Sequence, residues 1–168
     1  MKKIVLIFIS ALFFVSCGGD KKKEANTEDG KVDNYALILD VIYQKDDSLS
    51  VVYKKGGYYL YDKAVSCIVK GSPAIQRITI DLPQAEKIEN IALMASSNKE
   101  QESMVIKAIS VKNGNEFIVS GKDNFTTYFQ FDESFSWDEK SSKYLLNHNN
   151  KNQPGISGSD SLEILLTK

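Results

Sequence analysis

The chain has 168 residues, which suits one modest domain plus a targeting segment. Hydrophobic residues make up 42% of it and charged residues 26%, the balance of an ordinary globular protein with a packed core. Lysine and arginine total 21 against 22 aspartate and glutamate residues, so the formal net charge of −1 gives no electrostatic reason to expect a nucleic acid partner.

The amino terminus has the three parts of a secretory signal. Lys2 and Lys3 supply positive charge, residues 4–15 are apolar apart from Ser10, and small residues follow at positions 16–18. An apolar run of about a dozen residues is shorter than the roughly 20 that a membrane-spanning helix needs. We therefore expect residues 1–16 to be a cleaved signal peptide that takes no part in the fold.

The four residues Phe14–Cys17 (FVSC) resemble the lipobox of bacterial lipoproteins, with Phe14 in place of the usual leucine. The resemblance implies that the Cys17 thiol carries diacylglycerol, that cleavage occurs before Cys17, and that the new amino terminus is acylated. Several acyl chains would anchor the protein stably, because each buried methylene adds about 0.8 kcal/mol. The alternative is an ordinary secretory signal with an incidental cysteine.

Residues 17–33 contain almost no apolar side chain, and we interpret them as a lipidated flexible tether. Lys21–Lys23 would either contact anionic headgroups, at about 1 kcal/mol each, or be solvated. Lipoproteins with glycine after the lipidated cysteine, here Gly18, are often sent to the outer membrane of two-membrane bacteria. Because Lys21–Lys23 depart from the acidic stretch that marks surface export in some groups, the resemblance favours the periplasmic side.

Lipidation also bears on the second cysteine of the chain. With Cys17 alkylated, Cys67 has no intramolecular disulfide partner. Cys67 lies between apolar neighbours in SCIVK, so we expect it to be a small buried hydrophobe in a strand.

Residues 34–168 consist of short apolar segments with period two, separated by polar turns. Successive side chains of a strand point to opposite faces, so each alternating set marks one buried face. This pattern, with no extended helical period, predicts an all-β fold: an antiparallel β-sandwich of jelly-roll type. The expected buried sets are residues 35–43; Leu49, Val51 and Tyr53; Ile78, Ile80 and Leu82; Ile91 and Leu93; Val105, Ile109 and Val111; Phe117 and Val119; Phe125, Thr127, Phe129 and Phe131; and Leu162, Ile164 and Leu166.

The order of segments from Leu49 to Val111 resembles a bacterial jelly-roll domain of the galactose-binding-like, carbohydrate-binding-module kind. The matching segments are SLSVVYK, the Gly-aromatic turn GGYYLYD, IQRITIDLP, IENIALM and MVIKAISV. The resemblance covers a little over a third of the chain and is one of pattern more than of identities. It implies a jelly roll and an affinity for glycans, without naming a sugar.

Motifs for catalysis are missing from the sequence. The single histidine, His148, lies in the loop-forming run NHNNKNQPG, and GxSxG, Walker and CxxC patterns do not occur. The adjacent carboxylates Asp46-Asp47 and Asp132-Glu133 are interpreted as turn residues or solvated edges. We therefore expect no enzyme, no metal and no cofactor. Two alternatives stay open: distant carboxylates that converge as in a glycosidase, and the loops DGKVDN, KDDS and SGSDS converging on calcium.

Aromatic residues provide the strongest binding signal in the sequence. Sugar rings stack their C–H faces on aromatic rings, while amides and carboxylates bind the hydroxyl groups. A partly exposed platform is therefore expected from the aromatic residues, with polar partners beside it. Its candidate residues are Tyr58, Tyr59, Tyr61 and Trp137, with Asp138, Asn147 and Asn149 as the polar partners. The alternative is that these aromatic rings fill the core or edge of the sandwich.

These observations together predict a non-catalytic, lipid-anchored β-sandwich of the cell envelope that binds a glycan. The first alternative is a structural or assembly subunit that docks on an envelope protein, for which an exposed apolar patch would be the evidence. The second alternative is a hydrolase, which would need two carboxylates in one cleft.

Overall fold

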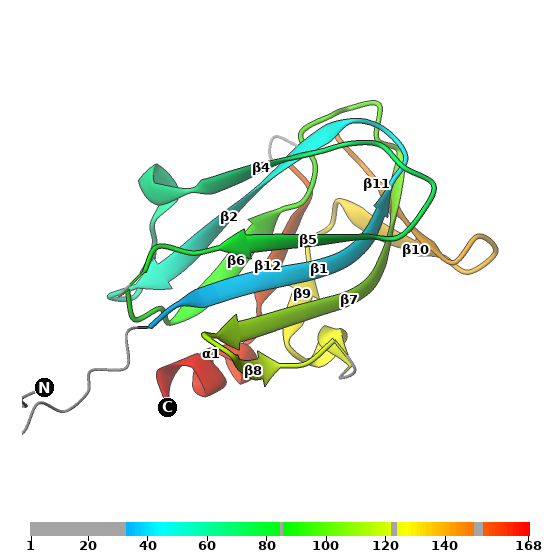
Figure 1. Cartoon of the computed structure of the whole chain (residues 1–168). Helices are drawn as coiled ribbons and strands as arrows, with labels where there is room; N and C mark the ends of the chain where they lie inside the picture. The colour runs from blue at the N-terminus through cyan, green and yellow to red at the C-terminus, as the bar shows by residue number, and fades with distance from the viewer. Residues whose placement is uncertain (1–32, 85, 122–123, 150–152) are drawn as a thin grey trace, which may run out of the picture. The chain divides into compact units, whose positions relative to one another are not determined.

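The computed structural model describes residues 33–84, 86–121, 124–149 and 153–168 (Figure 1). The expected signal peptide, the lipidated Cys17 and the lysines at positions 21–23 lie outside the described residues. Two antiparallel sheets, each of six strands, form the described part of the chain. The predicted class, an all-β antiparallel sandwich, is confirmed.

Sheet A has the strand order β10-β11-β7-β1-β5, with β8 also paired to β7. Its strands are β1 (Tyr35–Tyr43), β5 (Gln76–Asp81), β7 (Ser103–Asn113), β8 (Glu116–Val119), β10 (Phe135–Asp138) and β11 (Lys143–Leu146).

Sheet B has the order β3-β2-β6-β12-β9, with β4 also paired to β2. Its strands are β2 (Asp47–Lys55), β3 (Tyr58–Tyr59), β4 (Val65–Val69), β6 (Asn90–Met94), β9 (Phe129–Phe131) and β12 (Gly155–Gly158). Three short helices accompany the sheets: η1 (Tyr61–Lys63), η2 (Phe125–Thr127) and α1 (Asp160–Thr167).

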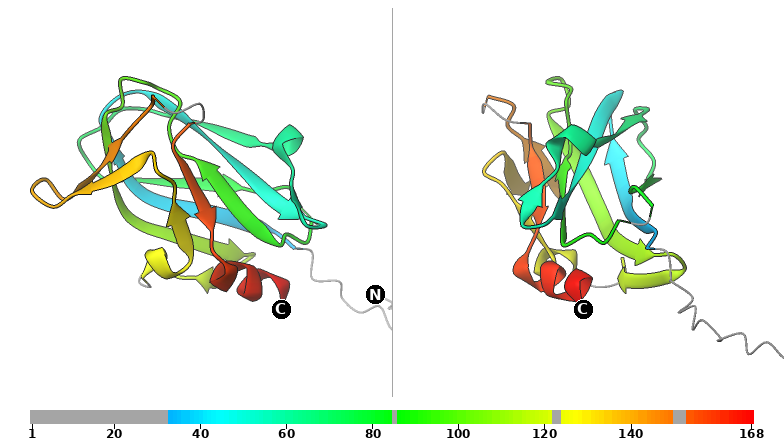
Figure 2. Two further views of the ribbon diagram at one scale, coloured as in Figure 1. Left: turned by 180° about the vertical axis from the view of Figure 1, so that it is seen from behind. Right: turned by 90° about the vertical axis from the view of Figure 1, so that its left-hand side faces the viewer.

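The two sheets lie face to face, with β5, β1 and β7 toward the viewer in Figure 1 and with β2, β6 and β12 toward the viewer from behind in Figure 2. The chain changes sheet between β1 and β2, between β4 and β5, and again at β5–β6 and β6–β7. Such repeated crossing is the connectivity of Greek-key and jelly-roll sandwiches. Because consecutive strands at these points lie in different sheets, both faces of the core are built from the same stretch of chain.

The core lies between the sheets and follows the predicted alternation in the early strands. In β2, Leu49, Val51 and Tyr53 are almost fully buried, as their spacing predicts. In β1, every second residue from Leu37 to Tyr43 is likewise buried. Burial of a large apolar side chain contributes about 1.5–3 kcal/mol, so these two strands supply much of the hydrophobic stabilisation.

A bulge in β7 changes the face on which its side chains lie. Asp40 pairs with Ala108, but Val41 pairs with Ile106, so Lys107 has no partner on β1. Because the extra residue shifts the alternation by one position, Ile106 and Ile109 both face the core. The prediction that Val105 shares a buried face with Ile109 is wrong for this reason.

A second irregularity separates two residues that were expected to share a face. Val111 pairs with Val119, and Lys112 pairs with Phe117, so Ile118 is the extra residue of β8. Val119 is fully buried, whereas the Phe117 side chain is 57% exposed. Phe117 therefore belongs to the outer surface of sheet A and not to the core.

The last apolar segment is a helix and not the expected strand. In α1, Leu162 and Leu166 are buried while Ile164 is 57% exposed. Positions 162 and 166 are one helical turn apart, so they face the core together, and a period-two reading of the same leucines wrongly adds Ile164. A strand was also expected over residues 125–131, but Phe125 and Thr127 belong to η2 and only residues 129–131 form β9.

Candidate functional site

Three of the four predicted aromatic residues are exposed. The side chain of Tyr58 is 77% exposed, that of Tyr61 is 68% exposed, and that of Trp137 is 53% exposed. Tyr59 is half-buried, and its burial raises the pKa of the phenol. Exposure of this extent means that Tyr58, Tyr61 and Trp137 are not core residues.

The structure does not bring these rings together in one platform. Tyr58 and Tyr59 form β3 at one edge of sheet B, whereas Trp137 lies in β10 at the edge of sheet A. The two views place η1 and the β10–β11 hairpin at opposite ends of the sandwich (Figures 1 and 2). The expected single platform is therefore wrong, because strand order places its members far apart.

Trp137 is the outermost ring of an aromatic cluster that joins the two sheets. The rings of Phe131 in β9 and Tyr144 in β11 are stacked, with centroids 4.7 Å apart. Trp137 meets Tyr144 edge-on, with centroids 5.0 Å apart. Packing of this kind holds the hairpin against sheet B and adds about 0.5–1.5 kcal/mol for each aromatic pair.

The predicted polar partners of the platform are engaged in local turns. The Asp138 carboxylate accepts hydrogen bonds from Ser141 Oγ at 2.5 Å and Lys140 N at 3.2 Å, and the Ser141 bond lowers the pKa of this carboxyl. The Asn147 side-chain oxygen accepts a hydrogen bond from the Asn149 amide at 3.0 Å. These contacts are the ordinary chemistry of Asx turns, so they account for the residue types at these positions.

Tyr61 instead borders a hollow on the outer face of sheet B, which we name the sheet-B hollow. Its volume is about 560 Å³, and β6 and β12 form its floor. Ile91, Leu93 and Ile156 face the core, so the positions between them face outward and carry small or flexible side chains. The lining includes Tyr61, Ala92, Met94, Asp132, Gln153, Gly155 and Ser157.

Asp132 is held in a defined position at one margin of the sheet-B hollow. Its carboxylate accepts hydrogen bonds from the amides of Ser134 at 2.9 Å and Gly155 at 2.8 Å. A Cβ atom at Gly155 would come within 2.9 Å of the same carboxylate, so glycine permits this close approach. Asp132 therefore offers a positioned acceptor beside an outward-facing serine, while Tyr61 supplies a ring at the hollow's margin.

Sequence reasoning missed the residues of this floor. It placed Asp132 among turn residues or solvated edges, gave no binding role to Ala92 or Gly155, and considered Ser157 only within the loop SGSDS as a possible calcium ligand. A signal was present, since Ala92, Gly155 and Ser157, which alternate with Ile91, Leu93 and Ile156, are small. Without the pairing of β6 with β12, however, nothing in the sequence indicates that these small residues are neighbours.

Asp47 is buried and both of its carboxylate oxygens accept hydrogen bonds, which differs from the expected turn or solvated position. One of its carboxylate oxygens accepts hydrogen bonds from the amides of Ser48, Ser97 and Asn98 at 2.7–2.9 Å, and the other accepts one from Ser96 Oγ at 2.5 Å. These donors pin the loop after β6 to the start of β2. Because both oxygens already face donors, this carboxylate is a structural anchor and does not suit a cation.

Two other residues named in the sequence have modest structural roles. Cys67 is half-buried and packs beside the core, so it is less buried than expected. His148 is also half-buried, and its Nε2 atom lies 3.0 Å from the backbone oxygen of Gln101. Neither side chain lines the sheet-B hollow.

Within the described residues, no group of three or more His, Cys, Asp or Glu side chains converges as a metal centre would require. None of the helices in the described ranges combines the length and the apolar content that a membrane crossing requires. No protein-family model matches the chain, and comparison with curated proteins found no significant match.

Proposed function

We propose that this protein is a non-catalytic envelope lipoprotein that binds a segment of a glycan in the sheet-B hollow. The observation that carries the proposal is the exposed Tyr61 ring beside a hollow of about 560 Å³ whose floor carries small or flexible side chains. Binding sites for small ligands combine such a concave surface with a few placed polar groups.

The lining residues offer the two kinds of contact that a sugar needs. The Tyr61 ring presents a flat apolar face for the C–H groups of a pyranose. Asp132 accepts hydrogen bonds, while the hydroxyl of Ser157 and the amide of Gln153 both donate and accept them. A neutral oligosaccharide with several hydroxyl groups fits this set better than a purely apolar ligand.

The number of carboxylates that line the sheet-B hollow favours binding of a glycan over its hydrolysis. Among the described residues that line the sheet-B hollow, Asp132 is the one carboxylate. Most glycoside hydrolases place a pair of carboxylates on either side of the bond that is cleaved. The proposal is therefore for retention of a glycan and not for its breakdown.

Anchoring follows from the lipobox resemblance of Phe14–Cys17. Acyl chains on Cys17 would hold the protein on a membrane, and the outer membrane with the domain on its periplasmic side is the proposed location. The first strand begins at Tyr35, two positions after the end of the proposed tether of residues 17–33. Such a tether would let the sandwich reach envelope glycans near the membrane surface.

The test is a glycan-array measurement on the mature lipidated protein in detergent micelles, with two tyrosine variants. Tyr61→Ala removes the ring at the hollow, and we expect it to weaken binding about tenfold, the effect of losing one stacking contact. Tyr58→Ala is the matched control, because Tyr58 is equally exposed but does not line the hollow. Equal losses in both variants, or an array with no bound glycan, would contradict the proposal.

A second candidate function is docking on an envelope protein, and one observation favours it. Ile68 lies on β4, which pairs only with β2 among the described strands, and its side chain is 81% exposed. Exposed apolar residues on an edge strand are typical of surfaces that pair with another chain. A site-specific cross-linker at position 66, which is Ser66, should then capture one defined partner in intact cells. Ile68→Asp should abolish that cross-link. An unchanged cross-link would contradict this function.

A further inference from the structure

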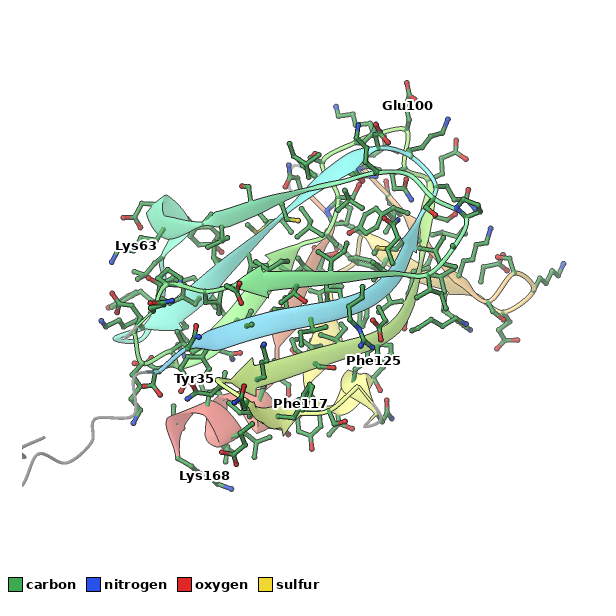
Figure 3. The ribbon with its side chains drawn as sticks, viewed as in Figure 1. Tyr35, Lys63, Glu100, Phe117, Phe125 and Lys168 are labelled. Atoms are coloured by element: carbon green, nitrogen blue, oxygen red, sulfur yellow. The ribbon has the colours of Figure 1, made fainter. Side chains whose placement is uncertain are left out.

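The opposite side of the sandwich carries a second hollow, which we name the sheet-A hollow. It has a volume of about 450 Å³ and lies on the outer face of β5, β1 and β7. Figure 3 shows this face, with Phe117 at its margin beside β7 and β8. The sheet-A hollow shares no residue with the sheet-B hollow.

The floor of the sheet-A hollow is set by strand register. Asp40 of β1 pairs with Arg77 on one side and with Ala108 on the other, which forms one row across three strands. In the adjacent row, Ile38 pairs with Ser110 of β7. Ala108 and Ser110 are small, so the floor is low between the Arg77–Asp40 pair and the Phe117 ring.

The chain that follows β8 closes one side of this hollow. A Cβ atom at Gly121 would lie 2.9 Å from both Ala108 Cβ and Ser110 Oγ, so glycine allows the backbone to rest on the floor. This contact leaves Ala108 and Ser110 nearly buried although they belong to the outer face. The backbone at Gly121 therefore forms one side of the hollow.

Arg77 and Asp40 form a two-pronged ion pair at one end. Arg77 Nε and Nη2 donate to the two carboxylate oxygens of Asp40, each at 2.7 Å, and this bonding lowers the pKa of the Asp40 carboxyl. The pair uses one edge of the guanidinium, and the edge that carries Nη1 faces away from Asp40. Each oxygen of Asp40 has a further lone pair, so the pair can still accept through Asp40 and donate through Nη1 at the far edge of the guanidinium.

We propose that the sheet-A hollow is a second carbohydrate site that holds one neutral pyranose unit. Hydroxyl groups at two positions of one sugar unit can donate to Asp40 and accept from Arg77 Nη1. The 57% exposed Phe117 ring offers a face to the C–H groups of the same unit. A neutral sugar is favoured over an anionic one because Asp40 cancels the charge of Arg77.

Two sites on opposite faces give the protein a property that a single site lacks. One molecule could hold two glycan strands, or two parts of one strand, and the second contact would then form at a high effective concentration. This inference does not depend on the sheet-B hollow, because the residues of the sheet-A hollow come from the other sheet.

The experiment is an NMR titration of the ¹⁵N-labelled mature lipidated protein in micelles. The probes are maltohexaose, cellohexaose and mannohexaose, and the readout is the amide shifts of residues 108–121 and of residues 92–94 with 155–158. We expect at least one probe to shift the 108–121 amides in a saturable way. Phe117→Ala and Arg77→Gln should each weaken that binding tenfold or more, while Tyr58→Ala, which lies outside both hollows, should leave it unchanged.

Lys107→Gln is the matched control, because it also removes one exposed positive charge from sheet A but lies outside the hollow. It should change the affinity less than twofold. Shifts confined to residues 92–94 and 155–158 would overturn the second site and leave the proposed function standing. Shifts at residues 108–121 that survive both Phe117→Ala and Arg77→Gln would also overturn it. An absence of shifts at both places with all three probes would overturn both proposals.

Discussion

The Tyr43 hydroxyl donates a hydrogen bond of 2.5 Å to the backbone oxygen of Ala95, and both residues are fully buried. Tyr43 ends β1 of sheet A, and Ala95 directly follows β6 of sheet B. The bond therefore joins the two sheets across the core. Tyr53 is equally buried, but its hydroxyl has no hydrogen-bond partner among the described residues.

This contrast predicts opposite effects for the same substitution. Tyr43→Phe leaves the Ala95 oxygen without its donor, and we expect the free energy of unfolding to fall by about 1–3 kcal/mol. Tyr53→Phe removes a buried hydroxyl group that makes no hydrogen bond, so the free energy of unfolding should stay the same or rise by up to about 1 kcal/mol. Urea unfolding followed by circular dichroism measures both changes. A loss for Tyr53→Phe as large as that for Tyr43→Phe would show that the Ala95 bond is not the cause.

Gly158 marks the closest approach between β12 and its surroundings. A Cβ atom there would overlap the side-chain oxygen of Asn90 and lie 2.7 Å from Leu162 Cδ2. Gly158→Ala should therefore lower the free energy of unfolding by about 1–3 kcal/mol, the usual cost of overpacking. Thermal unfolding provides the measurement.

Gly114→Ala is a useful comparison, because its cost has a different origin. Gly114 has φ of +58° and open space around the Cβ position. The substitution should cost about 1 kcal/mol through backbone strain alone. Combining Gly158→Ala with Asn90→Ala should recover part of the loss at Gly158, and no such recovery is expected for Gly114→Ala with Asn90→Ala.

The attachment of α1 to sheet B should depend on pH. Glu163 accepts hydrogen bonds from Lys54 Nζ at 2.7 Å and Asn90 Nδ2 at 3.1 Å, and these bonds lower the pKa of its carboxyl. A carboxyl whose pKa is lower in the folded state stabilises the protein above its unfolded pKa of about 4.3, and this contribution is lost as the pH falls through the folded value. Stability should therefore decline in acid below about pH 4.

Glu163→Gln should reduce that acid-dependent decline and cost less than about 1 kcal/mol at neutral pH, since the ion pair is partly exposed. Glu100→Gln is the control, because Glu100 is an exposed glutamate on the loop between β6 and β7. Unfolding free energies measured from pH 3 to pH 7 would separate the two variants. Identical pH profiles for the wild type and Glu163→Gln would contradict the role of this contact.

Lipidation at Cys17 can be tested apart from ligand binding. We expect Cys17→Ser to prevent acylation and signal cleavage at this position, because serine lacks the thiol that carries diacylglycerol. Intact-mass spectrometry of the membrane-extracted wild type should show the added acyl chains, and the variant should lack them. Cys67→Ser is the control and should retain the added mass. An unmodified Cys17 thiol in the mature wild-type protein would end the lipoprotein proposal.

The sequence by itself determined the fold class and the inward face of the regular strands. Leu49, Val51 and Tyr53 alternate with polar or smaller residues, and the burial of β2 follows from that local period. Alternation is a property of neighbouring residues, so it can be read without knowing which strands pair. The aromatic residues after Gly57 could also be singled out, and Tyr61 does border a hollow.

Tertiary structure decided where the alternation shifts and which residues meet. The bulges at Lys107 and Ile118 each add one residue to a strand, which reverses the faces beyond them. Strand order separates Tyr61 from Trp137, while it joins Arg77, Asp40 and Ala108 in one row. Contacts between strands depend on how the whole chain closes its loops, and that long-range choice is settled only when both sheets pack around a common core.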